Sequence, residues 1–156
     1  MHIVTTHRNT DFDGLASMVA ATLLYPGTVA VCPKNVNPNV HRFLSLHKTS
    51  FDIILSSEVN LETVSRLIVT DTNQWRRLDR LDHLKEREGV ELLLWDHHMG
   101  IGDLNPDWQC VEKIGATITL LVRAIQEQNL QLTPLQATLF LLGLYEDTGQ
   151  LTFSST

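Results

Sequence analysis

Cysteine is scarce in this sequence. Cys32 and Cys110 are the two cysteines among 156 residues, and they lie far apart with no Cys-x-x-Cys spacing. This pattern argues against a disulfide framework and against a zinc knuckle, both of which need clustered or regularly spaced cysteines. We expect two buried free thiols instead.

Long apolar runs and positive charge are scarce as well. No window approaches ~18 consecutive apolar residues, and the amino end lacks a basic leader and an apolar core of signal-peptide length. We therefore expect a cytoplasmic protein. The net charge of −6 argues against a broad nucleic-acid-binding surface, which requires a basic stripe. If four of the negative charges belong to one metal site, two divalent cations would bring the total to about −2.

The length and composition are those of one soluble globular domain with a substantial core, at 43% hydrophobic and 19% charged residues. The central stretch is LLLWDHH, residues 92–98, in which an apolar run ends in an acid and two histidines. Such a run is typical of a strand buried on both faces of a parallel sheet. Ligands in these folds bind just beyond the carboxyl ends of the strands.

Strands and helices alternate along the rest of the chain. Strands are predicted at 2–6, 28–32, 51–56 and 67–71, and helices at 13–24, 40–47, 60–66, 74–88, 115–128 and 133–145. Residues 100–107 are predicted to form a loop, and 151–156 a strand-like run. This order predicts an α/β fold, a doubly wound parallel sheet flanked by helices.

Acids and histidines follow three of the predicted strands. They are His7, Asp11 and Asp13 after the first, Asp71 at the end of 67–71, and Asp96, His97 and His98 at the end of the central strand. Because the carboxyl ends of parallel strands share one edge, these side chains are expected to converge. Asp147 follows an apolar helix.

Taken singly, these acids have simpler interpretations. Asp11 and Asp13 suit helix caps, and Asp71 and Asp147 suit loops or turns. Together, converging carboxylates would repel one another unless cations lay among them, and only Arg8 is a basic residue close in sequence. Carboxylate and imidazole ligands suit manganese, iron, zinc or magnesium, and two such cations can drive phosphate-ester hydrolysis. Asp71 is the best candidate for a bridging ligand.

Four motifs resemble a known family. HRNTDFDG (7–14), VTDT (69–72), WDHH (95–98) and EDTGQLTF (146–153) resemble the four motifs of the DHH phosphoesterase superfamily, and IGATITLL from Ile114 resembles its helix start after the third motif. The resemblance covers nearly all of residues 1–156. It implies a DHH-type amino-terminal catalytic domain.

The resemblance also implies roles for individual residues. One metal would be held by His7, Asp11 and Asp71, and the other by Asp13, Asp71, His97 and Asp147. His98 and Arg8 would contact the substrate phosphate, and Asp96 would orient an imidazole. The two divalent cations are expected to be Mn²⁺, with Mg²⁺ as the alternative.

A narrower resemblance concerns the segments between the motifs. Residues 15–27 and 37–47 look like the amino-terminal part of bacterial proteins in which a DHH module precedes CBS domains and a tRNA nucleotidyltransferase or poly(A) polymerase domain. Family members continue into a second, substrate-gripping domain that these 156 residues do not contain. We therefore expect a fragment of a larger chain, with weak activity of its own.

Three functions remain open from the sequence. The leading hypothesis is a two-metal phosphoesterase acting on nucleotides or short single-stranded RNA within a larger RNA-processing protein. The alternative is a non-catalytic nucleotide-binding or regulatory module of a nucleotidyltransferase. The third is a structural α/β domain whose acids merely cap helices.

Two further groups of residues are expected to have structural roles. Trp75, Trp95 and Trp108 are scattered, which favours packing over a base-stacking platform. Arg76, Arg77 and Arg80 could meet phosphates, but the interleaved Asp79 and Asp82 favour a solvated helix face.

Overall fold

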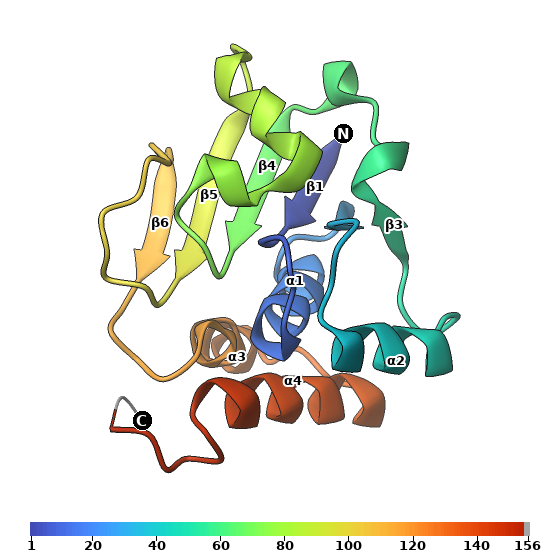
Figure 1. Cartoon of the computed structure of the whole chain (residues 1–156), viewed down its shortest axis with the longest axis vertical. Helices are drawn as coiled ribbons and strands as arrows, with labels where there is room; N and C mark the ends of the chain where they lie inside the picture. The colour runs from blue at the N-terminus through green and yellow to red at the C-terminus, as the bar shows by residue number, and fades with distance from the viewer. Residues whose placement is uncertain (155–156) are drawn as a thin grey trace.

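A six-stranded parallel sheet forms the centre of the protein (Figure 1). The computed structural model describes residues 1–154. In this part of the chain the strands are β1 (His2–Thr5), β2 (Thr28–Cys32), β3 (Ile53–Leu55), β4 (Arg66–Thr70), β5 (Glu91–Asp96) and β6 (Trp108–Val111). Their order across the sheet is β3-β2-β1-β4-β5-β6. The predicted fold class, a doubly wound parallel sheet flanked by helices, is confirmed.

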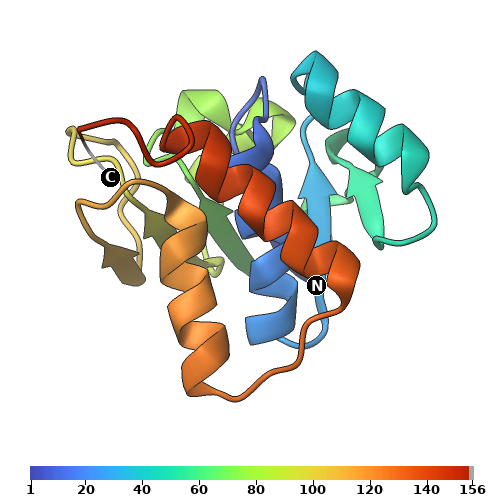
Figure 2. The same cartoon turned by 90° about the horizontal axis from the view of Figure 1, so that it is seen from below.

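Three helices lie on one side of the sheet, where the first two contact the strands and the third packs mainly across the first, as Figure 2 shows. They are α1 (Phe12–Leu24), α3 (Thr117–Glu127) and α4 (Pro134–Asp147), and a fourth helix, α2 (Pro38–Leu46), follows β2. Thr133 caps α4 through a reciprocal pair of hydrogen bonds with Gln136, and Pro134 occupies the first turn. Among the described residues, no helix combines the length and apolar character needed to span a bilayer.

Alternating side chains of the strands fill two separate cores. Val4, Ile68 and Leu93 face the α1, α3 and α4 side, whereas Leu67 and Leu94 face the opposite side. This alternation is the period of two that strand geometry imposes. The sheet is thus buried on both faces, as its apolar strands require.

The opposite face is covered by 3₁₀ turns, so the predicted helix over 74–88 is wrong. The segment forms Trp75–Arg77 and Asp79–Glu86 as 3₁₀ turns. Asp79 adopts a φ of 52°, which interrupts a right-handed helix, and its carboxylate accepts hydrogen bonds from Lys34 N and Ser56 Oγ. Tertiary contacts therefore override helix propensity here, although Leu78, Leu81 and Leu84 face inward as predicted.

Other local predictions need correction. The helix expected over 60–66 is a single 3₁₀ turn, Leu61–Thr63, and β4 begins at Arg66. The edge strand β6 was not predicted, because it is short and its first residue, Trp108, is 44% exposed. Residues 151–154 form turns closed by bonds to Thr148 O and Gly149 O, not a strand, and 155–156 lie outside the described residues. Both thiols are free, but Cys110 is only partly buried.

The crossing of α1 and α4 depends on Gly143. A Cβ atom there would lie 2.9 Å from Phe12 O and 3.1 Å from Asp13 Cα. We expect Gly143→Ala to force the helices apart and to lower the free energy of unfolding by about 1–3 kcal/mol. Chemical denaturation would measure this loss. Gly100→Ala is the matched control, because a Cβ at Gly100 would meet nothing within 4 Å; equal stability of the two variants would contradict the prediction.

Candidate metal centre

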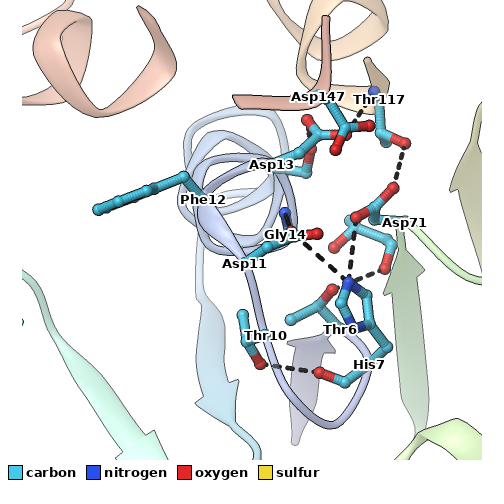
Figure 3. A network of polar contacts seen from close by, with 12 residues as sticks. Thr6, His7, Thr10, Asp11, Phe12, Asp13, Gly14, Asp71, Thr117 and Asp147 are labelled. Atoms are coloured by element: carbon cyan, nitrogen blue, oxygen red, sulfur yellow. Dashed lines mark hydrogen bonds and ion pairs between the residues drawn. The ribbon is translucent and has the colours of Figure 1, made fainter. Parts of the chain in front are cut away.

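The strand order places the candidate site between β1 and β4. Chain connections leave these neighbouring strands in opposite directions across the sheet, which opens a crevice at their carboxyl ends. His7, Asp11 and Asp13 lie in the segment that leaves β1 and begins α1, and Asp71 directly follows β4. Figure 3 shows these side chains pointing toward one another, with Asp147 approaching from the end of α4. The predicted convergence is therefore observed.

One group of possible ligands consists of His7, Asp11 and Asp71. His7 Nε2 lies 3.2 Å from Asp71 Oδ2 and 3.6 Å from Asp11 Oδ1. The other ring nitrogen, Nδ1, is 2.9 Å from Arg8 O and donates its proton to that carbonyl. This bond fixes the ring with Nε2 directed at the two carboxylates.

A second group consists of Asp13, Asp71, His97 and Asp147. His97 Nε2 lies 3.1 Å from Asp147 Oδ2, 3.4 Å from Asp71 Oδ1 and 4.0 Å from Asp13 Oδ2. Within each of the two groups, one potential ligand atom per residue lies within 4.8 Å of the others. A third group that meets the same condition joins Asp71 and His97 with His98.

The buried Nε2 of His97 tests whether these residues fit a metal. His97 Nδ1 bonds to Ile114 O at 2.9 Å, which directs the Nε2 lone pair into the carboxylates. Within residues 1–154, Nε2 has no hydrogen-bond partner of acceptable geometry. In a neutral ring, a buried nitrogen lone pair facing anionic oxygens is unfavourable, and either a proton on Nε2 or a metal ion bound to it removes the repulsion. The donor set therefore fits a divalent cation with imidazole and carboxylate ligands.

Thr117 and the start of α3 hold two of the carboxylates. Asp13 is fully buried and accepts hydrogen bonds from Thr117 N and Ile118 N, both at 2.8 Å. These N–H groups belong to the first turn of α3, where they lack partners within the helix and favour negative charge. Thr117 Oγ1 donates to Asp71 Oδ1 at 2.9 Å. Asp13 thus caps α3 and not its own helix, where Asp11 is the cap.

The importance of Thr117 was not predicted from the sequence. The sequence shows the Gly-Ala-Thr start of the helix but assigns no role to Thr117. Thr117 contacts Asp71, 46 positions earlier in the sequence, and Asp13, 104 positions earlier. Such contacts become visible only when the fold is known.

Backbone geometry at Asp71 and Gly14 is unusual. Asp71 has a φ of 62° and donates its N–H to Trp95 O at 2.9 Å. This left-handed conformation is costly for a residue with a Cβ and is retained where surrounding contacts impose it. At Gly14, a Cβ would lie 2.7 Å from Thr6 Oγ1 and 3.2 Å from His7 Nε2. Glycine therefore allows α1 to begin against His7.

Asp96 and His98 form a pair at the end of β5. The buried Asp96 Oδ1 accepts from the backbone N–H groups of His97 and His98 and lies 2.6 Å from His98 Nδ1. This contact engages Nδ1 and leaves Nε2 as the ring nitrogen available to a bound molecule. The His98 side chain is 47% exposed. Arg8, by contrast, belongs to none of the ligand groups and donates to Arg76 O on the surface.

The cluster attracts positive charge. Burial disfavours the charged form of His7, but its contacts with Asp11 and Asp71 outweigh burial and raise its pKa to about 10. The pKa of His97 rises to about 11 in the same way, against burial, through Asp147 and Asp71. The pKa of Asp71 falls well below its usual value despite burial, because His7 and His97 stabilise the carboxylate.

Asp13 shows the opposite shift. Burial and the charges of Asp71 and Asp147 raise its pKa, although two backbone N–H groups stabilise its anionic form. Without a metal, protons therefore supply part of the positive charge that the cluster needs.

Comparison with known proteins gives the family. The model of the DHH family, N-terminal domain, matches residues 2–144. The chain belongs to the DHH family.

Two curated relatives of this DHH chain are named A-adding tRNA nucleotidyltransferase. The protein from Geobacter sulfurreducens is 38% identical over 159 residues, and the one from Aquifex aeolicus is 29% identical over 155 residues. The matches cover 100% and 99% of this chain, which spans 18% of the length of each relative.

Two solved structures share the DHH fold. An exopolyphosphatase-related protein from Bacteroides fragilis matches 99% of this chain and 48% of its own, with a TM-score of 0.79 and 18% identity. A putative family II inorganic pyrophosphatase from Methanococcus jannaschii matches 100% of this chain and 51% of its own, with a TM-score of 0.72 and 22% identity. At these identities the likeness concerns the fold.

The raised pKa values predict that metal binding releases protons. At pH 8 the metal-free protein holds protons on His7 and His97, whose pKa values are about 10 and 11. A metal requires neutral imidazoles, so Mn²⁺ binding is expected to release at least about two protons, one from each histidine, and to tighten as pH rises toward those values. Calorimetry in buffers of different ionisation enthalpy would count the protons.

Two variants control this measurement. His97→Gln should release about one proton fewer. His83→Gln should release as many as the unchanged protein, because His83 is exposed and belongs to no ligand group among the described residues. A proton count that does not depend on His97 would contradict the prediction.

Proposed function

We propose that this domain is a two-metal phosphoesterase that hydrolyses phosphate esters of nucleotides or short single-stranded RNA. The observation that carries the proposal is the convergence of Asp13, Asp71 and Asp147 on the buried Nε2 of His97, at distances of 4.0, 3.4 and 3.1 Å. Membership of the DHH family supports phosphate-ester chemistry. The names of the two curated relatives support a place within a larger RNA-processing protein.

The ligand groups suggest how two cations would be held. His7, Asp11 and Asp71 would hold one, and Asp13, Asp71, His97 and Asp147 would hold the other, with Asp71 shared. Mn²⁺ suits this mixture of imidazole and carboxylate ligands, and Mg²⁺ is the alternative. When bound, such a pair supplies a water nucleophile near neutral pH and offsets negative charge on the reacting phosphate.

The remaining residues would orient the substrate. Asp96 holds His98 through Nδ1 at 2.6 Å, so Nε2 of His98 is positioned to donate a hydrogen bond to a nonbridging phosphate oxygen. The contact with Asp96 also raises the pKa of His98, which favours the protonated, donating form of the ring. Thr117 positions Asp71 and Asp13 from the start of α3.

One observation favours a second candidate function. The two curated relatives are named for adding nucleotides, and this chain spans 18% of their length. A domain that binds a nucleotide without cleaving it, and so regulates an attached nucleotidyltransferase, would fit those names. The intact set of possible ligands favours hydrolysis, because a binding module does not require two complete groups.

Replacing Asp71 tests the proposal directly. Asp71→Asn keeps the size of the side chain but removes a charge that both ligand groups use. We expect Mn²⁺-dependent hydrolysis of a dinucleotide to fall by about 10³-fold. Asp52→Asn, on an exposed residue outside the ligand groups, should hydrolyse it at the original rate. Binding of the dinucleotide without any turnover by the unchanged protein would favour the regulatory function.

Replacing Thr117 tests the positioning of the carboxylates. Thr117→Val removes the hydroxyl that donates to Asp71 and retains the shape of the side chain. We expect Mn²⁺ affinity, measured by calorimetry, to fall by about 10–100-fold. Thr119→Val is the control, since Thr119 lies two residues further along α3 and lines an apolar cavity. Unchanged affinity in the Thr117 variant would show that the hydroxyl does not set the site.

A further inference from the structure

A basic cavity lies beside the candidate metal centre. It has a volume of about 460 Å³ and is lined by Arg8, Asn9, Asn35, Arg76 and Arg77. Arg8 directly follows the possible ligand His7, while Arg76 and Arg77 belong to the turn that follows Asp71. Segments after β1 and β4 therefore form both the ligand cluster and this cavity.

The backbone fixes the cavity walls to one another. Arg8 N donates to Arg77 O at 2.7 Å, and Asn9 N donates to Asn35 O at 2.9 Å. The guanidinium of Arg8 donates to Arg76 O, and Arg76 Nε donates to Gln74 Oε1 at 3.0 Å. The side chains of Arg8 and Arg76 are thus held at the cavity by hydrogen bonds to neutral groups, and Arg77 through its backbone.

The positive charges of the cavity lack ion-pair partners. Within residues 1–154, no carboxylate lies within 4.0 Å of a guanidinium nitrogen of Arg8, Arg76 or Arg77. Arg66, by contrast, pairs with Glu91 at 2.6 Å, and Arg87 and Arg123 also lie beside carboxylates. Three like charges around one cavity repel one another, so an anion bound there would be stabilised.

The interleaved acids form no ion pair with these arginines among the described residues, and Arg76 and Arg80 are exposed, in line with the solvated face expected from the sequence. Burial raises the pKa of Asp79, but its hydrogen bonds and the charge of Arg8 lower it. The carboxylate of Asp79 is engaged by Lys34 N at 3.0 Å and Ser56 Oγ at 2.8 Å, and Asp82 does not line the cavity. Arg80 lies apart from the cavity and donates to the carbonyl oxygens of Ser56 and Val59. Arg80 therefore has a structural role, whereas Arg76 and Arg77 line the cavity together with Arg8.

Arg77 connects the basic cavity to the metal centre. It also lines a second cavity of about 270 Å³, whose lining includes Thr72, Asn73 and His98. His98 Nδ1 lies 3.9 Å from Asp71 Oδ1. A path lined by polar and basic groups thus runs from the possible ligand Asp71 past His98 and Arg77 to Arg8 and Arg76.

We propose that the cavity formed by Arg8, Arg76 and Arg77 binds a second phosphate of a substrate that carries several phosphates along a chain. Guanidinium groups make charge-assisted, bidentate hydrogen bonds to phosphate oxygens, and the amides of Asn9 and Asn35 add neutral donors. The role as a substrate subsite rests on the proposed function, since the first phosphate would lie at the metal centre. Binding of the phosphate chain itself does not require metal.

The test measures binding without metal. The full chain is titrated in EDTA against a fluorescein-labelled single-stranded oligoribonucleotide and, separately, against labelled linear polyphosphate, each followed by fluorescence anisotropy. Arg76→Gln/Arg77→Gln is compared with Arg42→Gln, an exposed arginine on α2 outside the cavity. Circular dichroism verifies that each variant is folded, and the single variant Arg77→Gln serves if the double variant is not.

We expect the double variant to bind at least about 10-fold more weakly than the unchanged protein. The slope of log K against log salt concentration should become shallower by about 1.4. Arg42→Gln should bind like the unchanged protein. Loss with the oligoribonucleotide alone identifies a nucleic-acid strand, and loss with polyphosphate alone identifies an inorganic chain; loss with both identifies phosphate recognition in general.

Other outcomes would overturn the inference. One is that the unchanged protein binds neither ligand. Another is that the double variant binds with the same affinity as the unchanged protein. A third is that Arg42→Gln loses as much affinity as the double variant. The hydrolysis assay with Asp71→Asn tests the proposed function, whereas the binding assay without metal tests this inference. If the protein binds the strand through Arg76 and Arg77 but never hydrolyses it, the phosphate-binding cavity stands and the phosphoesterase proposal fails.

Discussion

Repulsion among buried carboxylates is the constraint on which this structure depends. Asp13 and Asp71 are almost fully buried, and Asp147 completes the group from a third element. Such a cluster is unfavourable unless positive charge balances it. The first turn of α3, the hydroxyl of Thr117 and the raised pKa of His97 each supply part of that balance. A divalent cation bound to His97 Nε2 would replace the proton there and place more positive charge among the carboxylates.

The fold makes this costly arrangement possible by bringing its elements very close together. The strand order sets β1 beside β4, so residues that follow two strands distant in sequence reach the same crevice. The left-handed backbone of Asp71 allows its carboxylate to approach His7. The absence of a Cβ at Gly14 allows α1 to begin against the same histidine. Gly143 allows α4 to carry Asp147 against Asp13. Local strain and close packing are thus concentrated at the site, as is common where function opposes stability.

The sequence predicted the clustering of these side chains better than it predicted the surrounding backbone. Acids and histidines after apolar strands converge for a geometric reason that holds for any parallel sheet, so Asp13, Asp71 and His97 could be placed together without coordinates. The 3₁₀ turns after Asp71 could not be predicted from the sequence. The φ of 52° at Asp79 accompanies hydrogen bonds with Lys34 and Ser56, which are distant in sequence. Thr117 was missed for the same reason: its partners lie on other elements.

The arginines show what a segment's charge pattern leaves out. Within residues 76–82 the interleaved signs predict a solvated face, and Arg76 and Arg80 are exposed, but folding also turns Asp79 toward Ser56 and brings Arg8 beside Arg76. A chain of net charge −6 therefore carries a concentrated positive cavity next to a concentrated negative cluster. The proposed metal ions would balance the cluster and a bound phosphate would balance the cavity, so a phosphate chain crossing from one to the other with its metal ions would satisfy both. The opposed charges of the two regions are in this sense a single recognition surface, which the net charge of the chain conceals.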